Sequence, residues 1–328
     1  MAGSNFTHHL LTPLSSINPS KRQVFAIVGP TASGKSELAL SLALRIGGEI
    51  INCDSVQVYR DIEIATAKVP LDERQQVAHH LIDFVPPDIN YTAGEWARDA
   101  SMKIDEIEAR GCTALLVGGT GFYLRALRNP FFPSPPTDEK LRERLNKMRK
   151  ARGAPYLHRL LKRVDAESAA TLFERDWPRV QRAIEVRLQT GLPFSVQKSA
   201  RLMPSESASR IRVFALNPPR SELYRRINER TDAHFAAGLV EEVRVLLEQG
   251  VPADSNALGA HGYRRVVEYL RGERDLESAI NQTKLDVRHY SKRQMTWFRR
   301  EKRVEWVDGF GDDTSVQERI IQMVVGDI

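Results

Sequence analysis

The sequence predicts an α/β protein in which helices flank a mostly parallel sheet and a helical domain is inserted into the chain. Short apolar segments alternate with amphipathic helical stretches over the first 129 residues. A long basic stretch follows, and β-type sequence returns only at residues 212–216. Alternating strands and helices favour a parallel sheet, and 328 residues are enough for a core and an insertion.

Three apolar segments form the first part of the expected sheet, at residues 23–28, 49–53 and 113–117. Each runs into an unusual loop, which begins with Gly29, with Asp54 or with a glycine pair. Because the carboxyl ends of parallel strands meet at one edge of a sheet, we expect a ligand to bind where these loops lie. The helical stretches that follow the first two strands are residues 37–45 and 91–110.

The middle of the chain has a different amino-acid composition. After the proline-rich stretch PFFPSPP, residues 140–163 hold ten Lys or Arg and one Glu, with leucines at helical spacing. A further helix is expected to begin with Asp176 as N-cap and Pro178 in the first turn, and to end near Gly191. We therefore expect residues 130–205 to form a helical insertion with a basic face.

The expected organisation of the chain has five parts. They are a flexible N-terminal tail (1–22), the first part of the core (23–129), the insertion (130–205), the completion of the core with the C-terminal helices (206–310), and a C-terminal tail (311–328).

Composition narrows the classes of protein to consider. The net charge of +6 and the pI near 9.3 are compatible with a polyanionic partner. Two cysteines, Cys53 and Cys112, cannot build a disulfide framework or a paired-cysteine zinc site, so we expect a cytoplasmic protein. No apolar run approaches the roughly 18 residues that span a bilayer, so no membrane association is expected. His79 and His80 have no cysteine nearby and are interpreted as structural.

Residues 29–36, GPTASGKS, satisfy the phosphate-loop pattern, with a strand before and a helix after. The glycines let successive backbone N–H groups turn inward, and the helix N-terminus adds the positive end of its dipole. Lys35 supplies a point charge, and Ser36 would reach a Mg²⁺ cofactor. The sheet is therefore expected to be P-loop NTPase-like.

The loop alone does not say which phosphates it holds. Nucleoside triphosphates are the common ligand, and a prenyl or other diphosphate fits equally well. Strand 113–117 ends in glycines rather than in the Asp that assists the metal in many nucleotide hydrolases, a departure that many small-molecule kinases share. Asp54 should lie beside the loop, either as a general base, as a metal ligand through water, or as the cap of the next turn.

Taken together, these segments resemble the bacterial tRNA dimethylallyltransferases over about residues 24–300. At Ala65 and His261 the sequence departs from the usual glycine and aliphatic residue of that family. The motifs that carry the resemblance, all in the same order, are GPTASGKS, DSVQVYR from Asp54, TAK from Thr66, HHLID from His79, GGTGFYLRAL from Gly118, DWPRVQRAIEV from Asp176, GYR from Gly262 and KRQMTWFR from Lys292.

The resemblance implies transfer of a dimethylallyl group from dimethylallyl diphosphate to N6 of an adenosine next to the anticodon, at expected position 37, with diphosphate leaving. Asp54, Thr120 and Arg230 are the implied catalytic residues, and Asp54 would take the N6 proton. Which of Arg226 and Arg230 faces the diphosphate stays open at this point. The implied donor-binding residues, with Mg²⁺ on Ser36, are Gly29, Thr31, Ala32, Ser33, Gly34, Lys35, Ser36 and Arg226.

The implied partner is the anticodon stem-loop of tRNA, bound by a monomer. Tyr59, Phe122 and Trp297 are candidates either for stacking on loop bases or for core positions. The expected tRNA-binding residues are Asp54, Ser55, Val56, Gln57, Thr120, Arg142, Pro178, Arg179, Val180, Gln181, Arg182, Gly262, Tyr263, Arg264, Arg288, Lys292, Arg293 and Gln294.

Two other functions are compatible with the phosphate loop. A small-molecule kinase shares the loop, the sheet and an insertion that closes as a lid, and it predicts ATP turnover. A non-catalytic RNA-binding NTPase switch would bind nucleotide to regulate its affinity for RNA, and it has no special need for Asp54.

Overall fold

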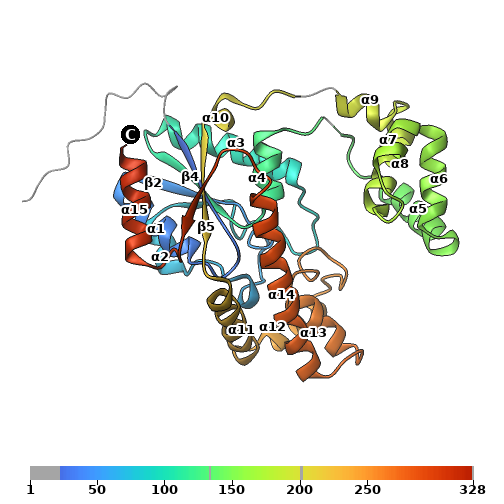
Figure 1. Ribbon diagram of the computed structural model, residues 1–328. Helices are drawn as coiled ribbons and strands as arrows, with labels where there is room; N and C mark the ends of the chain where they lie inside the picture. Colours follow the sequence, from blue (N-terminus) through green and yellow to red (C-terminus); the bar gives the residue numbers. More distant parts are fainter. Residues whose placement is uncertain (1–22, 133, 200–201, 327–328) are drawn as a thin grey trace, which may run out of the picture. The chain divides into compact units, whose positions relative to one another are not determined.

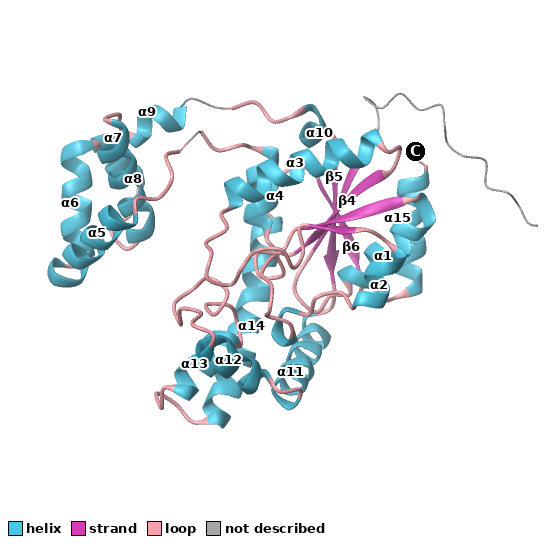
Figure 2. Ribbon diagram, turned by 180° about the vertical axis from the view of Figure 1, so that it is seen from behind, coloured by secondary structure: helices cyan, strands magenta, loops and turns pink. Residues whose placement is uncertain are grey.

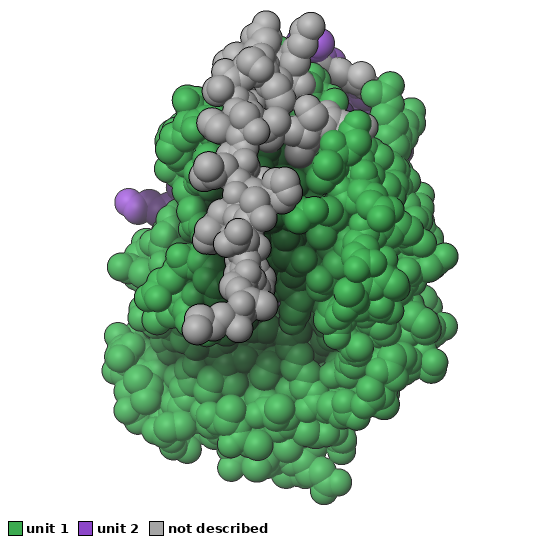
Figure 3. All heavy atoms as spheres, turned by 90° about the vertical axis from the view of Figure 1, so that its left-hand side faces the viewer, with its two compact units in different colours: residues 1–128, 205–328 green, residues 129–204 purple. Residues whose placement is uncertain are grey.

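The computed structural model describes residues 23–132, 134–199 and 202–326, so the tail expected at 1–22 lies outside the described residues. The chain divides into two compact units (Figures 1 and 3). Unit 1 comprises residues 1–128 and 205–328, and unit 2 comprises residues 129–204. The second unit begins and ends within one residue of the insertion expected from the sequence.

Unit 1 is built on a parallel six-stranded sheet in the order β3-β2-β4-β1-β5-β6. The central strand β1 is buried along its whole length because it pairs with β4 on one side and β5 on the other. The phosphate loop therefore leaves the middle of the sheet. The strands are β1 (Val24–Val28), β2 (Gly48–Asn52), β3 (His79–His80), β4 (Thr113–Gly118), β5 (Ile211–Asn217) and β6 (Val304–Asp308).

Helices cover both faces of this sheet (Figure 2). One apolar cluster contains Leu38 and Leu42 of α1, and the other contains Trp96 and Ile104 of α3. Burial on both faces explains why the strands are continuous apolar runs rather than alternating ones. The helices of unit 1 are α1 (Lys35–Ile46), α2 (Leu71–Gln76), α3 (Ala93–Ala109), α4 (Gly121–Arg128), α10 (Glu206–Ser209), α11 (Arg220–Ala236), α12 (Leu239–Glu248), α13 (Tyr263–Leu270), α14 (Leu276–Phe298) and α15 (Thr314–Val325), with a 3-10 turn η2 (Ile64–Thr66).

The C-terminal region differs from the expectation of a tail at 311–328. Strand β6 extends the sheet beside β5, and α15 then returns to pack on α1. Val316, Ile320 and Val324 of α15 are buried in the same apolar cluster as α1. The three buried side chains of α15, four residues apart, leave only a short periodic pattern in the sequence. Strand β6 lies at the sheet edge, buries one of its five residues and shows no continuous apolar run.

Unit 2 is a bundle of short helices with its own apolar core. Helix α8 starts after Asp176 and stops at Gly191, whose φ of 74° is the left-handed conformation that glycine adopts most readily. The helices of unit 2 are α5 (Glu139–Arg152), α6 (Ala154–Val164), α7 (Ala166–Thr171), α8 (Trp177–Thr190) and α9 (Phe194–Ser199). Core side chains include Leu145, Leu157, Leu161, Val180, Ala183 and Ile184.

A buried carboxylate organises the polar interior of unit 2. Both oxygens of Glu185, which is fully buried, accept hydrogen bonds of 2.9 Å from Arg142 on α5, and Arg182 lies 3.3 Å away. Gln181 donates to the same carboxylate at 3.3 Å. Burial alone would raise the pKa of Glu185, but the bonds and charge of Arg142 hold it below its usual range.

This arrangement involves part of the expected tRNA surface, which stays a prediction. The polar groups of Arg142, Gln181 and Arg182 are engaged around Glu185, and the side chain of Val180 is fully buried. Of the residues expected from that helix, Pro178 and Arg179 are the exposed ones. Arg and Gln in a helix look the same in a sequence whether they point inward to a carboxylate or outward to a partner.

Replacing Glu185 with Ala should destabilise unit 2 by about 2–3 kcal/mol, because the arginines lose their shared anion but are themselves about a quarter to a third exposed. Hydrogen exchange of the α5 and α8 amides measures this directly. Glu167→Gln, which changes an exposed acid of α7, is the matched control and should leave exchange unchanged. Equal protection in both variants would contradict the organising role of Glu185.

Candidate functional site

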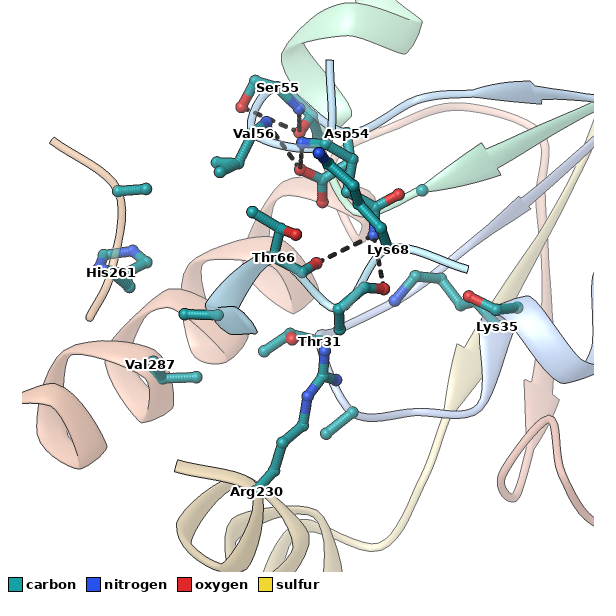
Figure 4. A pocket seen from close by; sticks show the side chains of 18 of the residues that line it. Thr31, Lys35, Asp54, Ser55, Val56, Thr66, Lys68, Arg230, His261 and Val287 are labelled. Carbon is teal, nitrogen blue, oxygen red and sulfur yellow. Dashed lines mark hydrogen bonds between the residues drawn. The ribbon is translucent and has the colours of Figure 1, made fainter. Parts of the chain in front are cut away.

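A cavity of about 1230 Å³ opens in unit 1 at the carboxyl ends of the strands. Its walls come from the phosphate loop, the segment after β2, the end of β4, and helices α11 and α14. Figure 4 shows side chains of these elements around the cavity, with Lys35, Asp54 and Arg230 reaching it from different sides. The edge predicted from the loops is therefore the edge that carries the cavity.

The phosphate loop connects β1 to α1 through residues with left-handed backbone, Ala32 at φ 61° and Gly34 at φ 77°. The ammonium of Lys35 donates to the carbonyl of Pro30 at 2.6 Å. Burial lowers the pKa of Lys35 to about 8, and the charge of Asp54 partly opposes that shift. Among the described residues, the buried hydroxyl of Ser33 has no hydrogen-bond partner. The loop thus presents one hydroxyl without a partner and one cation to an anion.

Gln294 of α14 fastens the phosphate loop to the end of β4. Its amide oxygen accepts from the Thr31 N–H at 2.9 Å, and its amide nitrogen donates to the Gly119 carbonyl at 3.0 Å. A Cβ atom at Gly119 would lie 2.0 Å from that nitrogen, and one at Gly118 would lie 2.1 Å from the Cys53 carbonyl oxygen. Close packing therefore explains the glycine pair. Gln294 was expected to contact tRNA, whereas the structure places it, buried, between two loops.

Asp54 serves the turn that follows β2 and still faces the cavity. Its Oδ1 accepts from the backbone N–H of Val56 at 2.9 Å and of Gln57 at 3.4 Å. The Ser55 N–H donates to Thr120 Oγ1 at 3.0 Å, which ties the same turn to the end of β4. The capping role considered from the sequence is therefore real for Oδ1. Oδ2 takes no part in these bonds and is the oxygen available for chemistry.

Two further residues expected to touch tRNA have internal roles. The amide of Gln57 donates to the carbonyls of Thr66 and Ala67 at 3.1 Å each. The hydroxyl of the fully buried Tyr263 donates to Glu242 at 2.5 Å. Both side chains therefore hold the loop around η2 in place, and this loop forms one wall of the cavity.

The two arginines of α11 differ in their partners. Arg226 contacts both oxygens of Asp312, at 2.9 and 2.8 Å, and lies over the ring of Phe310. Arg230 has no carboxylate within 4.0 Å among the described residues, and its Nε donates to His234 at 3.4 Å. Figure 4 shows Arg230 extending toward Thr31. Arg230 is therefore the arginine whose charge is free for a ligand on the phosphate loop.

Other residues from the expected site lie around the cavity or on its outer side. Lys292 and Arg293 of α14 are exposed, Arg288 is half-buried, and Arg264 is exposed beside Glu268. Gly262 adopts φ 92° at the start of α13, and a Cβ there would lie 3.4 Å from that of Ala65. The two departures from the family pattern, at Ala65 and at the preceding His261, are thus adjacent in space.

The three aromatic candidates divide between core and surface. Tyr59 is 2% exposed and belongs to the core, whereas Phe122 is 48% exposed and packs edge-on against the half-buried Trp297. Only Phe122 of the three offers a broad accessible ring.

The sequence did not single out His234, Phe310 or Asp312 as site residues. A spacing of four residues from Arg230 was the one signal for His234. Phe310 and Asp312 follow the unrecognised strand β6, so no signal marked them.

The carboxylates and imidazoles of the described residues form no cluster of three or more that could hold a metal ion. Ser36, at the cavity wall, fits a Mg²⁺ ion that shares its coordination with phosphate oxygens and water, as Mg²⁺ usually does in phosphate sites. His79 and His80 instead bond to the Val77 carbonyl and to Glu49. In the described part of the chain, no helix is both long and apolar enough to cross a membrane.

Comparison with protein families matches residues 57–301 to the family described as IPP transferase, and residues 22–82 to isopentenyl transferase. A tRNA dimethylallyltransferase of Solibacter usitatus is 46% identical over 299 residues, covering 91% of this chain and 97% of the relative. One from Geobacter metallireducens is 44% identical over 301 residues, with coverages of 92% and 97%.

Solved structures show the same likeness. The tRNA isopentenylpyrophosphate transferase of Bacillus halodurans superposes with a TM-score of 0.68 at 35% identity, covering 94% of this chain and 97% of that one. A eukaryotic dimethylallyltransferase described as acting on tRNA gives a TM-score of 0.76 at 26% identity, with coverages of 92% and 78%.

The affinity for inorganic diphosphate should fall as the pH rises through about 8, since Lys35 loses its proton there and can no longer attract the anion. Titration calorimetry below and above pH 8 measures this. The Lys35→Arg variant keeps its positive charge over that range. Any pH dependence that it shows therefore comes from titration of diphosphate itself. A wild-type profile parallel to that of the arginine variant would exclude Lys35 as the titrating group.

Proposed function

Because this chain belongs to the IPP transferase family, we propose that it transfers a dimethylallyl group from dimethylallyl diphosphate to N6 of an adenosine in tRNA, releasing diphosphate. The observation that carries the proposal is the composition of one cavity. The phosphate loop, Lys35 and Arg230 lie on one side, and the carboxylate of Asp54 lies on the other. Among the described residues neither of these two cations has a carboxylate partner. An anion clamp opposite a base suits displacement of diphosphate by a nucleophile.

The donor side stabilises the leaving group. Residues 31–36 hold the diphosphate, with the backbone N–H groups of residues 32–36 as donors, and Lys35 and Arg230 offset the negative charge that grows on it as the carbon–oxygen bond breaks. When bound beside Ser36 with the donor, Mg²⁺ supplies further positive charge at the same oxygens. Burial lowers the pKa of Arg230, and the charges of Glu37 and Asp54 partly oppose that shift.

The acceptor side positions a weak nucleophile. The N6 amine of adenine is neutral and poorly nucleophilic, so orientation matters more than full deprotonation before attack. As the N6–carbon bond forms, one N6 proton passes to Oδ2 of Asp54, and diphosphate leaves with the electrons of the broken carbon–oxygen bond. Thr120 acts on this step by holding Ser55, and through it the turn that aims Asp54.

The charge distribution supports a nucleic acid as the acceptor. Residues 129–204 contain 16 Lys or Arg and 8 Asp or Glu, whereas the rest of the chain has 32 and 34. The insertion thus carries all of the excess positive charge, which suits a phosphate backbone. A base must leave its stack to enter a cavity, and this is least costly in a single-stranded loop. We therefore propose the anticodon stem-loop as the bound region and adenosine 37 as the target.

The proposal is tested by mass analysis of the adenosines from unmodified tRNA after incubation with protein, Mg²⁺ and dimethylallyl diphosphate. We expect one adenosine beside the anticodon to gain a dimethylallyl group. A parallel incubation with labelled ATP and candidate small-molecule acceptors should give no phosphoryl transfer. Phosphoryl transfer without prenylated adenosine would instead identify a kinase.

Asp54→Asn should lower prenyl transfer by roughly 10²-fold or more, the scale of losing a general base, and leave tRNA binding near normal. The Asn oxygen can still accept from Val56, so the turn survives and the loss is chemical. Asp61→Asn is the matched control, because Asp61 is exposed and its left-handed backbone suits Asn. Single-turnover transfer and tRNA binding are measured for both. Unchanged transfer in Asp54→Asn removes Asp54 from the mechanism and favours the nucleotide-switch function.

A further inference from the structure

The turn between β6 and α15, residues 309–313, lies directly against the phosphate loop. The Gly311 N–H donates to the Ser33 carbonyl at 2.8 Å. A Cβ atom at Gly311 would lie 2.1 Å from the Gly34 carbonyl oxygen, and one at Gly34 would lie 2.6 Å from the Asp312 nitrogen. The two backbones therefore touch with no room for a side chain between them.

The same turn also holds helix α11. Phe310 packs in a small apolar cluster with Leu223 and Ile227 of α11, and Ala32 of the phosphate loop borders that cluster. On the outer side, Asp312 binds the Arg226 guanidinium through both oxygens, and the guanidinium lies 3.8 Å from the centre of the Phe310 ring. Apolar, ionic and backbone contacts thus converge on five residues.

We propose that the 309–313 turn is a strut that sets the distance between the phosphate loop and α11, and that Arg226 is a positioning residue of this strut rather than a ligand of the diphosphate. Arg230 lies one helical turn beyond Arg226 and is oriented by His234 alone among the described side chains. Its reach toward Lys35 therefore depends on where α11 is held. The strut would keep the two cations at the spacing of one diphosphate.

If Arg226 instead contacts the donor directly, removing Asp312 should change diphosphate binding in the opposite direction. In that case Asp312 is an anion that competes with the diphosphate for Arg226 and repels it, so removing Asp312 should strengthen binding. If Asp312 is instead part of the strut, removing it lets α11 drift and should weaken binding. The direction of change in a single variant separates the two roles.

The test is a double-mutant cycle of Asp312→Ala and Arg226→Met, measured by calorimetry with inorganic diphosphate and by the KM for dimethylallyl diphosphate. Each single variant should weaken binding about 5- to 10-fold, and the double variant should be no weaker than Arg226→Met alone, since that variant already removes the contact with Asp312 along with a weaker one to Glu222. The kcat should fall as well, because a displaced Arg230 offsets less of the charge that grows on the leaving group, whereas the affinity for tRNA should change less than about twofold. Stronger binding in Asp312→Ala, unchanged binding, or multiplied effects in the double variant would each overturn the strut.

Glycine substitutions give an independent measurement. Gly311→Ala forces its methyl group into the Gly34 carbonyl and should weaken diphosphate binding by about tenfold or more. Gly326→Ala, at the end of α15, has its nearest contact at 3.4 Å and should bind as the wild type does. Wild-type binding by a folded Gly311→Ala variant would contradict the proposal. If Gly311→Ala does not fold, the double-mutant cycle of Asp312→Ala and Arg226→Met tests the proposal.

The inference rests on the proposed donor, but the two can fail separately. Binding of inorganic diphosphate reports on the strut whether or not tRNA is prenylated. Failure of transfer with an intact binding cycle would overturn the proposed function alone, and normal transfer with no coupling between Asp312 and Arg226 would overturn the strut alone.

Discussion

The hydrogen bonds of the Gln294 amide are the interaction on which the site depends, because they join the loops that follow β1 and β4. Both loops must keep an irregular backbone, one to turn its N–H groups toward an anion and the other to let α14 approach. A buried amide with one donor and one acceptor in use fixes their spacing with little freedom. The Thr120 contact to the turn of Asp54 then extends this rigidity to β2.

The sequence was sufficient to predict the parallel sheet and the strand, loop and helix around residues 29–36, and the expected insertion lies within one residue of unit 2. Each of these leaves a local pattern, such as a run of apolar residues, a glycine-lysine-serine loop or a proline-rich boundary. It was not sufficient to predict β6 and α15, because β6 is a partly exposed edge strand without a continuous apolar run and α15 buries only three apolar residues, four positions apart. Their position is decided by the exposed edge of β5 and by the apolar face of α1, which are tertiary features.

The candidate site shows the same division at the level of single residues. Lys35, Asp54 and Arg230 meet in one cavity, as their motifs suggested. Gln294 and Tyr263 lie in motifs of the same family, yet they are buried and hold loops. A motif marks residues that a family needs, and it does not distinguish a group that touches substrate from one that supports its neighbour. Hydrogen-bond partners and burial make that distinction.

The contact of Gly311 with Ser33 also bears on how the protein matures during synthesis. Residues 29–36 are made long before the turn at residues 309–313 against which they pack. A nascent chain that ends before β6 can pair its other strands and still lacks the wall against which the loop packs. Contacts so distant in sequence form late, so competence to hold diphosphate should be acquired only after β6 and the 309–313 turn have been made.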